Sequence, residues 1–232
     1  MQKKECLNRR EFCATAAMGL FAMGALASPA LAQTGDASRK PSKTDPARIR
    51  KILDEMESKI GRYWSTPRKD AELLNLMVKA TRAVNVLEVG TSQGYSAIWM
   101  GRGLEETGGR LTTIEIDAER HSVARKNVQE AGLSGRVTLI RGDAHKEIRG
   151  LKGPFDFVFL DADKDGQMDY FKKIYPKNLA LGGMIALHNA ISEAADMKDY
   201  TDMIRRRADF DTVIISATMG DGICLSYRHR AA

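Results

Sequence analysis

Residues 86–100 read VLEVGTSQGYSAIWM, and this stretch decides the fold. A short apolar run ends in an acid and a glycine, a loop of small residues follows, and an amphipathic segment comes next. This order predicts a strand, a tight turn and a helix, the layout of a nucleotide-type pocket in an α/β sheet. Gly90 and Gly94 stand where the backbone must bend sharply and approach a ligand without a Cβ in the way.

The loop differs from two common nucleotide-binding patterns. A dinucleotide fingerprint needs three glycines in the order G-x-G-x-x-G, whereas this loop has two, spaced G-x-x-x-G. A phosphate-binding P-loop is also excluded, because no G-K-[ST] follows. A nucleoside-like ligand without a pyrophosphate fits the loop better, and S-adenosylmethionine is such a ligand.

The N-terminal end has the pattern of an export signal. A twin-arginine pattern lies at 8–12, an Ala/Gly/Met-rich stretch follows at 13–27, and Ala30-Leu31-Ala32 predicts cleavage before Gln33. We therefore expect residues 1–32 to be a twin-arginine signal peptide that directs the folded protein to the periplasm. An uncleaved amphipathic anchor is the alternative.

The predicted mature chain has a mild charge and one cysteine. Removal of residues 1–32 reduces 36 basic and 30 acidic residues to 32 and 28, so the net charge falls from +6 to +4. The basic residues are scattered, so we expect no nucleic-acid binding, and no membrane span is expected after processing. Cys224 remains alone, which predicts a domain without an internal disulfide.

The mature chain is expected to hold one α/β domain. Residues 33–44 are polar and predict a disordered leader, and residues 45–232 are expected to form the domain. Helices are expected from Asp45-Pro46 and over Lys69–Arg82. Strands that alternate with helical segments are expected at Val84–Val89, Arg110–Ile116, Arg136–Ile140, Phe155–Asp161 and Met184–Leu187, followed by a hairpin of Thr212–Ser216 and Ile223–Tyr227. This order predicts a mostly parallel sheet that an antiparallel C-terminal strand completes.

Candidate binding residues follow the first three strands, because ligands in such sheets bind beyond the strands' carboxyl ends. The first strand contributes Glu88 and the Gly90–Gly94 loop. Glu115 follows the second strand, where its carboxylate can accept both hydroxyls of a ribose. A helix-start acid is the alternative for Glu115, although Asp117 suits that position better. Asp143, beside Ala144, is placed to touch an adenine, and the alternative is a plain helix N-cap.

Polar clusters also follow the fourth and fifth strands. Residues 161–165 hold three acids and a lysine, which predict either a site or a solvated helix cap. His188-Asn189 comes after the fifth strand. A lone histidine there is usually a hydrogen-bonded structural residue, but a position opposite Asp161 on the neighbouring strand favours a functional one.

Four motifs in this order and spacing, VLEVGTSQGYSAIWM, TTIEID, VFLDADKD and LHNAI, resemble the cation-dependent O-methyltransferases. That family includes the catechol and caffeoyl-CoA enzymes and their bacterial relatives. The resemblance covers about residues 45–228. It implies the Rossmann-like class I methyltransferase fold, a seven-stranded sheet with a reversed last strand, and it also implies a homodimer.

The resemblance implies a role for each matching residue. The methionine end of S-adenosylmethionine would meet Glu88, Gly90, Ser92, Gly94 and Ser96. Glu115 would hold the ribose, and Ala144 with its neighbours, among them Asp143, would meet the adenine. Asp161 would bind both the cofactor region and a divalent cation, Asn189 would be a second cation ligand, and Lys164 would be catalytic. The family pattern is Asp-Asn where this chain has His188-Asn189.

His188 puts the metal in question rather than the cofactor. Imidazole suits Mn²⁺, Fe²⁺, Co²⁺ or Zn²⁺ better than Mg²⁺. The sequence therefore leaves three outcomes open: Asp161, His188 and Asn189 hold a transition metal, the site stays empty and His188 acts as a base, or activity is lost.

The sequence as a whole predicts an S-adenosylmethionine-dependent O-methyltransferase that acts on a hydroxyl of a small acceptor, catechol-like or phenolic. A non-catalytic protein of the same fold that binds S-adenosylmethionine or a metabolite is the alternative. An NAD-dependent oxidoreductase is a third interpretation, against which the two-glycine loop counts.

Overall fold

The structure, a computed structural model, describes residues 44–216 and 220–230, apart from the side chain at position 60. The predicted signal peptide and the predicted leader up to residue 43 lie outside these residues. Thr44 is described, and its backbone N–H and hydroxyl both donate to the carboxylate of Glu105, at 2.9 and 2.7 Å. The described residues form one unit.

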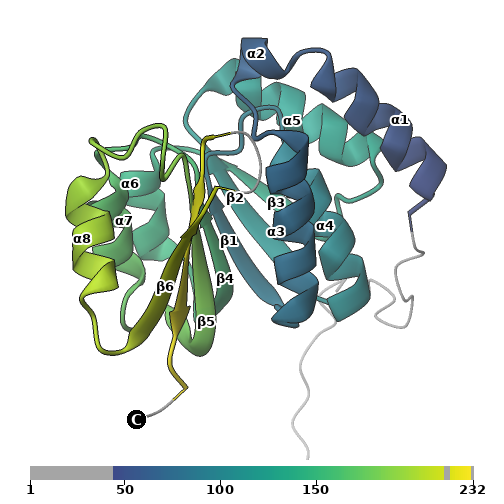
Figure 1. Ribbon diagram of the computed structural model, residues 1–232. Coiled ribbons are helices and arrows are strands. Elements are labelled where there is room, and N and C mark those ends of the chain that lie inside the picture. Colours follow the sequence, from purple (N-terminus) through teal and green to yellow (C-terminus); the bar gives the residue numbers. More distant parts are fainter. Residues whose placement is uncertain (1–43, 217–219, 231–232) are drawn as a thin grey trace, which may run out of the picture. The chain divides into compact units, whose positions relative to one another are not determined.

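A seven-stranded sheet in the order β3-β2-β1-β4-β5-β7-β6 is the centre of this unit (Figure 1). Five strands are parallel: β1 (Asn85–Val89), β2 (Arg110–Glu115), β3 (Val137–Arg141), β4 (Phe155–Leu160) and β5 (Leu179–His188). β7 (Ile223–Arg228) is antiparallel to both β5 and β6 (Phe210–Ile215). The predicted α/β class, the mostly parallel seven-stranded sheet and the antiparallel C-terminal strand are confirmed.

Strand β5 begins earlier than the sequence predicts, at Leu179 rather than Met184. Gly182 has a positive φ of 77°, and the register of β5 against β4 shifts between Phe155 and Phe157. Glycines weaken a strand signal and often mark such an irregularity, so the first half of β5 resembles a loop in the sequence.

Helices cover both faces of the sheet, as Figure 1 shows. One face carries α1 (Pro46–Glu57), α3 (Arg68–Ala80), α4 (Tyr95–Thr107) and α5 (Ala118–Glu130). The other carries α6 (Ala144–Glu147), α7 (Gln167–Ile174) and α8 (Lys198–Arg205). The short α2 (Ile60–Tyr63) leads to α3. Phe157 and Phe159 of β4 pack into the first layer, and Val158 and Leu160 into the second, which explains why the strand is apolar throughout.

Local signals set the starts of the first helices. Asp45 is the N-cap of α1, where its carboxylate accepts from the backbone N–H of Ala47 at 3.0 Å, and Pro46 occupies the first turn as predicted. The predicted helix at 69–82 is α3. Among the helices of the described residues, none has the length and apolar character that crossing a membrane requires.

Candidate active site

A cavity of about 970 Å³ opens at the carboxyl ends of the parallel strands. The loops after β1 to β5 and the segment between α2 and α3 line it. The predicted site residues in this lining are Gly90, Ser92, Ser96, Glu115, Asp143, Ala144, Asp161, Lys164, His188 and Asn189. Glu88 and Gly94 lie outside the lining. The structure therefore gathers residues from separate motifs into one space, at the edge of the sheet where ligands bind in such folds.

The loop after β1 passes closely over the end of β4. Gly90 has a φ of 95°, and a Cβ there would collide with the backbone carbonyl of Asp161. Gly94 begins α4 with a φ of 86°, and a Cβ there would lie 3.3 Å from the Cβ of Ala124 on α5. Gly90 thus allows the loop after β1 to approach the end of β4 closely, whereas Gly94 allows two helices to pack closely.

Glu88 is fully buried behind this loop. Its Oε1 accepts from the hydroxyl of Ser96 at 2.5 Å, and its Oε2 has no hydrogen-bond partner within the part of the chain that the structure describes. Burial raises the pKa of Glu88 to about 8, although the hydrogen bond from Ser96 opposes the shift. We therefore expect Glu88 to be protonated at neutral pH. Its contact with Ser96 supports the loop from behind.

The raised pKa of Glu88 predicts a pH-dependent stability. A carboxyl group with a folded pKa of about 8 and an ordinary value of 4.5 binds more protons in the folded protein between these values, so its contribution to stability is present below pH 4.5 and is lost as the pH rises to 8. Glu88→Gln should remove this loss, which denaturant unfolding between pH 5 and 9 can measure. The exposed Glu130→Gln is the control, and equal pH slopes in wild type and Glu88→Gln would refute the assignment.

Glu115 ends β2 with its carboxylate held by the backbone. Its Oε2 accepts from the N–H of Ser92 at 2.7 Å, and its Oε1 accepts from the N–H of Asp117 at 2.9 Å. Asp117 is the N-cap of α5 and accepts from the N–H of Arg120 at 2.8 Å. The alternative role for Glu115, a helix-start acid, thus belongs to Asp117. Each oxygen of Glu115 keeps acceptor capacity toward the cavity that it lines.

An aromatic wall stands next to Asp143 and Ala144. Asp143 is the N-cap of α6 and accepts from the N–H of His145 at 2.9 Å, so the N-cap alternative is confirmed, while Asp143 also lines the cavity. The rings of His145 and Tyr170 stack with their centroids 4.4 Å apart. Asp163 contacts both rings, through His145 Nε2 at 3.2 Å and the Tyr170 hydroxyl. Asp163 therefore belongs to this aromatic wall and, unlike Asp161, hydrogen-bonds to its rings.

A network of charged side chains around Asp161 also lines the cavity. Asp161 Oδ1 accepts from Lys164 Nζ at 2.9 Å and lies 3.2 Å from His188 Nδ1, and its Oδ2 accepts from the hydroxyl of Thr66 at 3.0 Å. The other ring nitrogen of His188, Nε2, lies 3.1 Å from Asp70 Oδ2. The side chains of Lys164 and Asp161 are only 21% and 12% exposed, so their ion pair lies in the cavity wall rather than in solvent.

The charges of Asp161, Lys164 and His188 affect one another's pKa values. Burial lowers the pKa of His188, but the neighbouring Asp161 carboxylate and hydrogen bonds to Asp161 and Asp70 outweigh it and raise that pKa to about 10. Burial likewise opposes ionisation of Asp161, but His188 and Lys164 lower its pKa overall. The group therefore carries ionised Asp161 and protonated His188 at neutral pH.

The side chains predicted to bind a metal have hydrogen-bond partners within the protein. Both ring nitrogens of His188 lie within hydrogen-bond distance of carboxylates. An ionised carboxylate only accepts, so in this arrangement each nitrogen faces an acceptor and the imidazole acts as the donor. Asn189 has a φ of 60°, and its amide donates to the Ser192 hydroxyl at 3.2 Å. That Asp161, His188 and Asn189 hold a cation together stays a prediction, in which both ring nitrogens of His188 would have to compete with these contacts.

Sequence reasoning missed Asp70, Thr66 and Tyr170. Asp70 is in the first turn of α3, where an acid is ordinary, but it shares the buried face with Leu74 and Val78 and is itself fully buried. An acid on the apolar stripe of a helix was the available signal. Thr66 and Tyr170 carried no signal of this kind.

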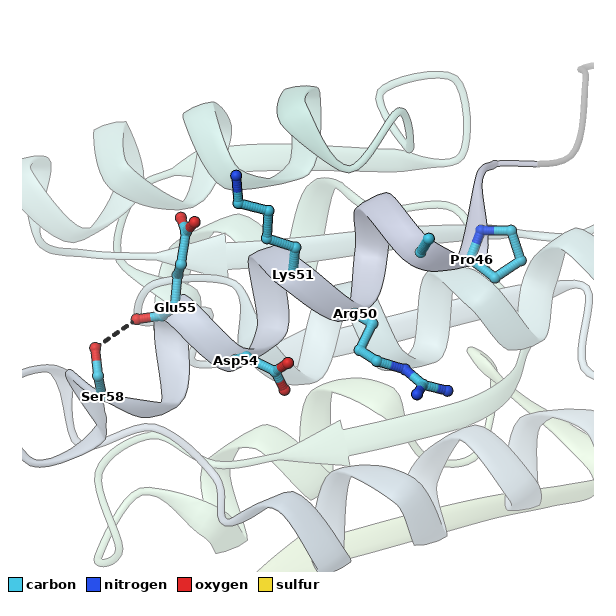
Figure 2. A pocket seen from close by; sticks show the side chains of 7 residues that line it. Pro46, Arg50, Lys51, Asp54, Glu55 and Ser58 are labelled. Carbon is cyan, nitrogen blue, oxygen red and sulfur yellow. Dashed lines mark hydrogen bonds between the residues drawn. The ribbon is translucent and has the colours of Figure 1, made fainter.

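A second hollow lies along the outer face of α1 (Figure 2). It is lined by Pro46, Ala47, Arg50, Lys51, Asp54, Glu55 and Ser58, all exposed. Figure 2 shows the hydrogen bond that the Ser58 hydroxyl donates to the carbonyl of Glu55, at 2.8 Å. Two basic and two acidic residues share this solvated face, so we look for the chemistry of the protein in the first cavity.

Comparison with known proteins agrees with this placement. The family described as O-methyltransferase matches residues 40–229. A catechol O-methyltransferase from Mycobacterium tuberculosis is 32% identical over 173 residues, 68% of this chain and 78% of that protein. Another from Niastella koreensis is 42% identical over 105 residues, 44% of this chain, and the match spans 47% of that protein's length.

Solved structures show the same likeness. An O-methyltransferase from Bacillus cereus in complex with SAH has a TM-score of 0.69 at 26% identity and covers 79% of this chain and 91% of its own. The O-methyltransferase TomG from Streptomyces achromogenes, in complex with SAM, has a TM-score of 0.68 at 25% identity and covers 81% of this chain and 92% of its own. The chain therefore belongs to the family of S-adenosylmethionine-dependent O-methyltransferases.

Proposed function

We propose that the protein transfers the methyl group of S-adenosylmethionine to a hydroxyl oxygen of a small phenolic acceptor of the catechol kind. One observation carries the proposal: a single cavity holds Glu115 at the end of β2 and the Asp161–Lys164 pair at the end of β4. The Glu115 carboxylate can accept hydrogen bonds from ribose hydroxyls, and the Asp161–Lys164 pair can stabilise an ionising acceptor hydroxyl. The two relatives named catechol O-methyltransferase favour the acceptor class.

The cavity wall fits the cofactor. Gly90 lets the loop after β1 run directly against the backbone of Asp161 at the cavity wall, and the buried Glu88 supports this loop from behind the lining through Ser96. In the proposal, Ser92 and Ser96 meet the methionine end and Glu115 accepts from the ribose hydroxyls. Ala144 and the stacked rings of His145 and Tyr170 border the adenine.

The reaction is an in-line displacement, in which the sulfur–carbon bond breaks as the oxygen–carbon bond forms. When bound, the cofactor supplies a methyl group activated by a positively charged sulfur. The acceptor must lose its hydroxyl proton, which passes to solvent, and its oxygen then carries negative charge. Lys164, held by Asp161 at 2.9 Å, orients this oxygen and stabilises its charge.

An acceptor panel tests the proposal. Methyl-labelled S-adenosylmethionine is offered with catechol, with its monomethyl ether and with the dimethyl ether, which has no free hydroxyl. We expect label in the first two and none in the third. A binding protein without turnover would leave the label in the cofactor, and an oxidoreductase would instead change the absorbance of NADH.

Export through the twin-arginine pathway to the periplasm is also part of the proposal, and the sequence of residues 1–32 supports it. Replacing Arg9 and Arg10 by lysine should leave full-length precursor in the cytoplasm, because this pathway reads the arginine pair. Fractionation followed by N-terminal sequencing measures the result. The same exchange at the exposed Arg48 and Arg50 of α1 is the control. Processed protein that starts at Gln33 outside the cytoplasm in the Arg9/Arg10 variant would refute the twin-arginine assignment.

A further inference from the structure

The imidazole of His188 bridges two buried carboxylates. Nδ1 lies 3.2 Å from Asp161 Oδ1, and Nε2 lies 3.1 Å from Asp70 Oδ2. Asp70 is fully buried and the His188 side chain is 5% exposed. The resemblance to cation-dependent enzymes implies a carboxylate at position 188, which would place three acidic groups close together, an arrangement that a cation stabilises. Here position 188 instead places an imidazole, with a ring nitrogen toward each of the other two carboxyl groups.

We infer that His188, clamped between Asp70 and Asp161, takes the place of the divalent cation, so that this enzyme transfers methyl groups without a bound metal. The inference rests on the proposed function, because it assigns the positive charge next to the acceptor site to His188 and Lys164. Both side chains contact the same oxygen of Asp161 and both line the cavity.

Asp70 is a positioning residue in this arrangement. It comes from the buried face of α3, on the opposite side of the imidazole from Asp161, and fixes the direction of the ring through Nε2. The ring is also packed by Phe159, with centroids 6.2 Å apart and planes at 61°. The two hydrogen bonds and the contact with Phe159 hold the imidazole in this orientation.

A metal site that also uses His188 and Asp70 is the rival arrangement. Asp70, His188 and Asp221 offer ligand atoms that lie within 4.8 Å of one another. A transition metal on these three would displace the hydrogen bond between His188 and Asp70, and Asp221 would then be required. Asp221 is not part of the bridge that Asp70 and Asp161 form, so it separates the two arrangements.

Metal binding tests the inference independently of activity. Manganese is titrated into the wild type, His188→Asp and Asp221→Asn by calorimetry, and the metal content of protein purified without chelator is measured. We expect no stoichiometric manganese or zinc in the wild type and about one manganese per chain in His188→Asp, where carboxylates replace the imidazole. Stoichiometric metal in the wild type overturns the inference, and its loss in Asp221→Asn would assign it to the rival arrangement.

Activity adds a second arm. Chelation should change the wild-type rate by less than about twofold, and should lower the rate of His188→Asp at least about tenfold until Mg²⁺ is returned. A wild-type rate that collapses on chelation and recovers with metal overturns the inference. If no variant methylates any acceptor while cofactor binding persists, the proposed function fails, but the metal titrations still decide the inference.

A spectroscopic arm tests the clamp itself. The wild type should show a downfield proton NMR signal from the hydrogen-bonded His188 Nε2–H, and Asp70→Asn should shift or lose it. Asp70→Asn should also lower kcat about tenfold with the KM for the cofactor unchanged, because His188 loses its orientation while the cofactor residues stay. Asp70→Glu should recover part of kcat. An unchanged signal and an unchanged kcat in a folded Asp70→Asn variant would refute the positioning role.

Discussion

Lys164→Ala is expected to lower turnover by roughly 10²- to 10⁴-fold while the affinity for the cofactor stays nearly intact. Lys164 Nζ is held 2.9 Å from Asp161 Oδ1 in the cavity wall, and the side chain is 21% exposed. An ammonium in this place acts on the acceptor oxygen when negative charge develops, so its loss falls on kcat rather than on cofactor binding. Single-turnover rates and cofactor calorimetry separate the two effects.

Lys198→Ala is the matched control for this variant. Lys198 also pairs with an aspartate, Asp202, but its side chain is 68% exposed and lies outside the cavity lining. We expect wild-type turnover from it. A small loss of rate in Lys164→Ala, joined to a large loss of stability, would show that Lys164 is structural.

Glu115→Ala is expected to weaken cofactor binding by about 1.5–3 kcal/mol, the scale of charge-assisted hydrogen bonds lost from a buried site, which is about 10- to 150-fold in Kd. Part of this loss comes from the backbone, because the N–H groups of Ser92 and Asp117 lose their acceptor. Calorimetry with S-adenosylmethionine and with its demethylated product gives the two affinities.

Two further variants separate these contributions. Glu115→Gln keeps one acceptor oxygen, so it should fall between the wild type and Glu115→Ala. Glu119→Ala, on an exposed side chain of the following helix, should bind like the wild type. Unchanged affinity in Glu115→Ala would remove Glu115 from the ribose role.

The sequence was sufficient for the sheet and for most of the cavity lining. Alternating apolar strands and helices gave the topology, and the rule that ligands bind at the carboxyl ends of parallel strands led to Glu115, Asp161 and His188. The turn at Gly90 could be predicted because a glycine follows the strand, and the structure shows that a side chain there would collide with Asp161. Oligomeric state and localisation stay predictions.

The sequence could not supply contacts between distant segments. Asp70 and His188 are 118 positions apart, and no local pattern indicates that an acid in the first turn of α3 ends against the ring after β5. That contact places a second carboxylate against the ring of His188, and our inference about the metal depends on it. Glu88 similarly matches a cofactor motif by position, but the depth of its burial, which places it behind the lining, is a tertiary property.

The most direct test of methyl transfer is a single turnover. Enzyme in excess is loaded with methyl-labelled S-adenosylmethionine, mixed with catechol and quenched at intervals, and the label is located by chromatography and mass spectrometry. Our account predicts that the label appears in the methoxy group of a monomethylated product at the rate at which the cofactor is consumed, and that Lys164→Ala slows both. Label that remains in the cofactor while both ligands are bound would contradict it.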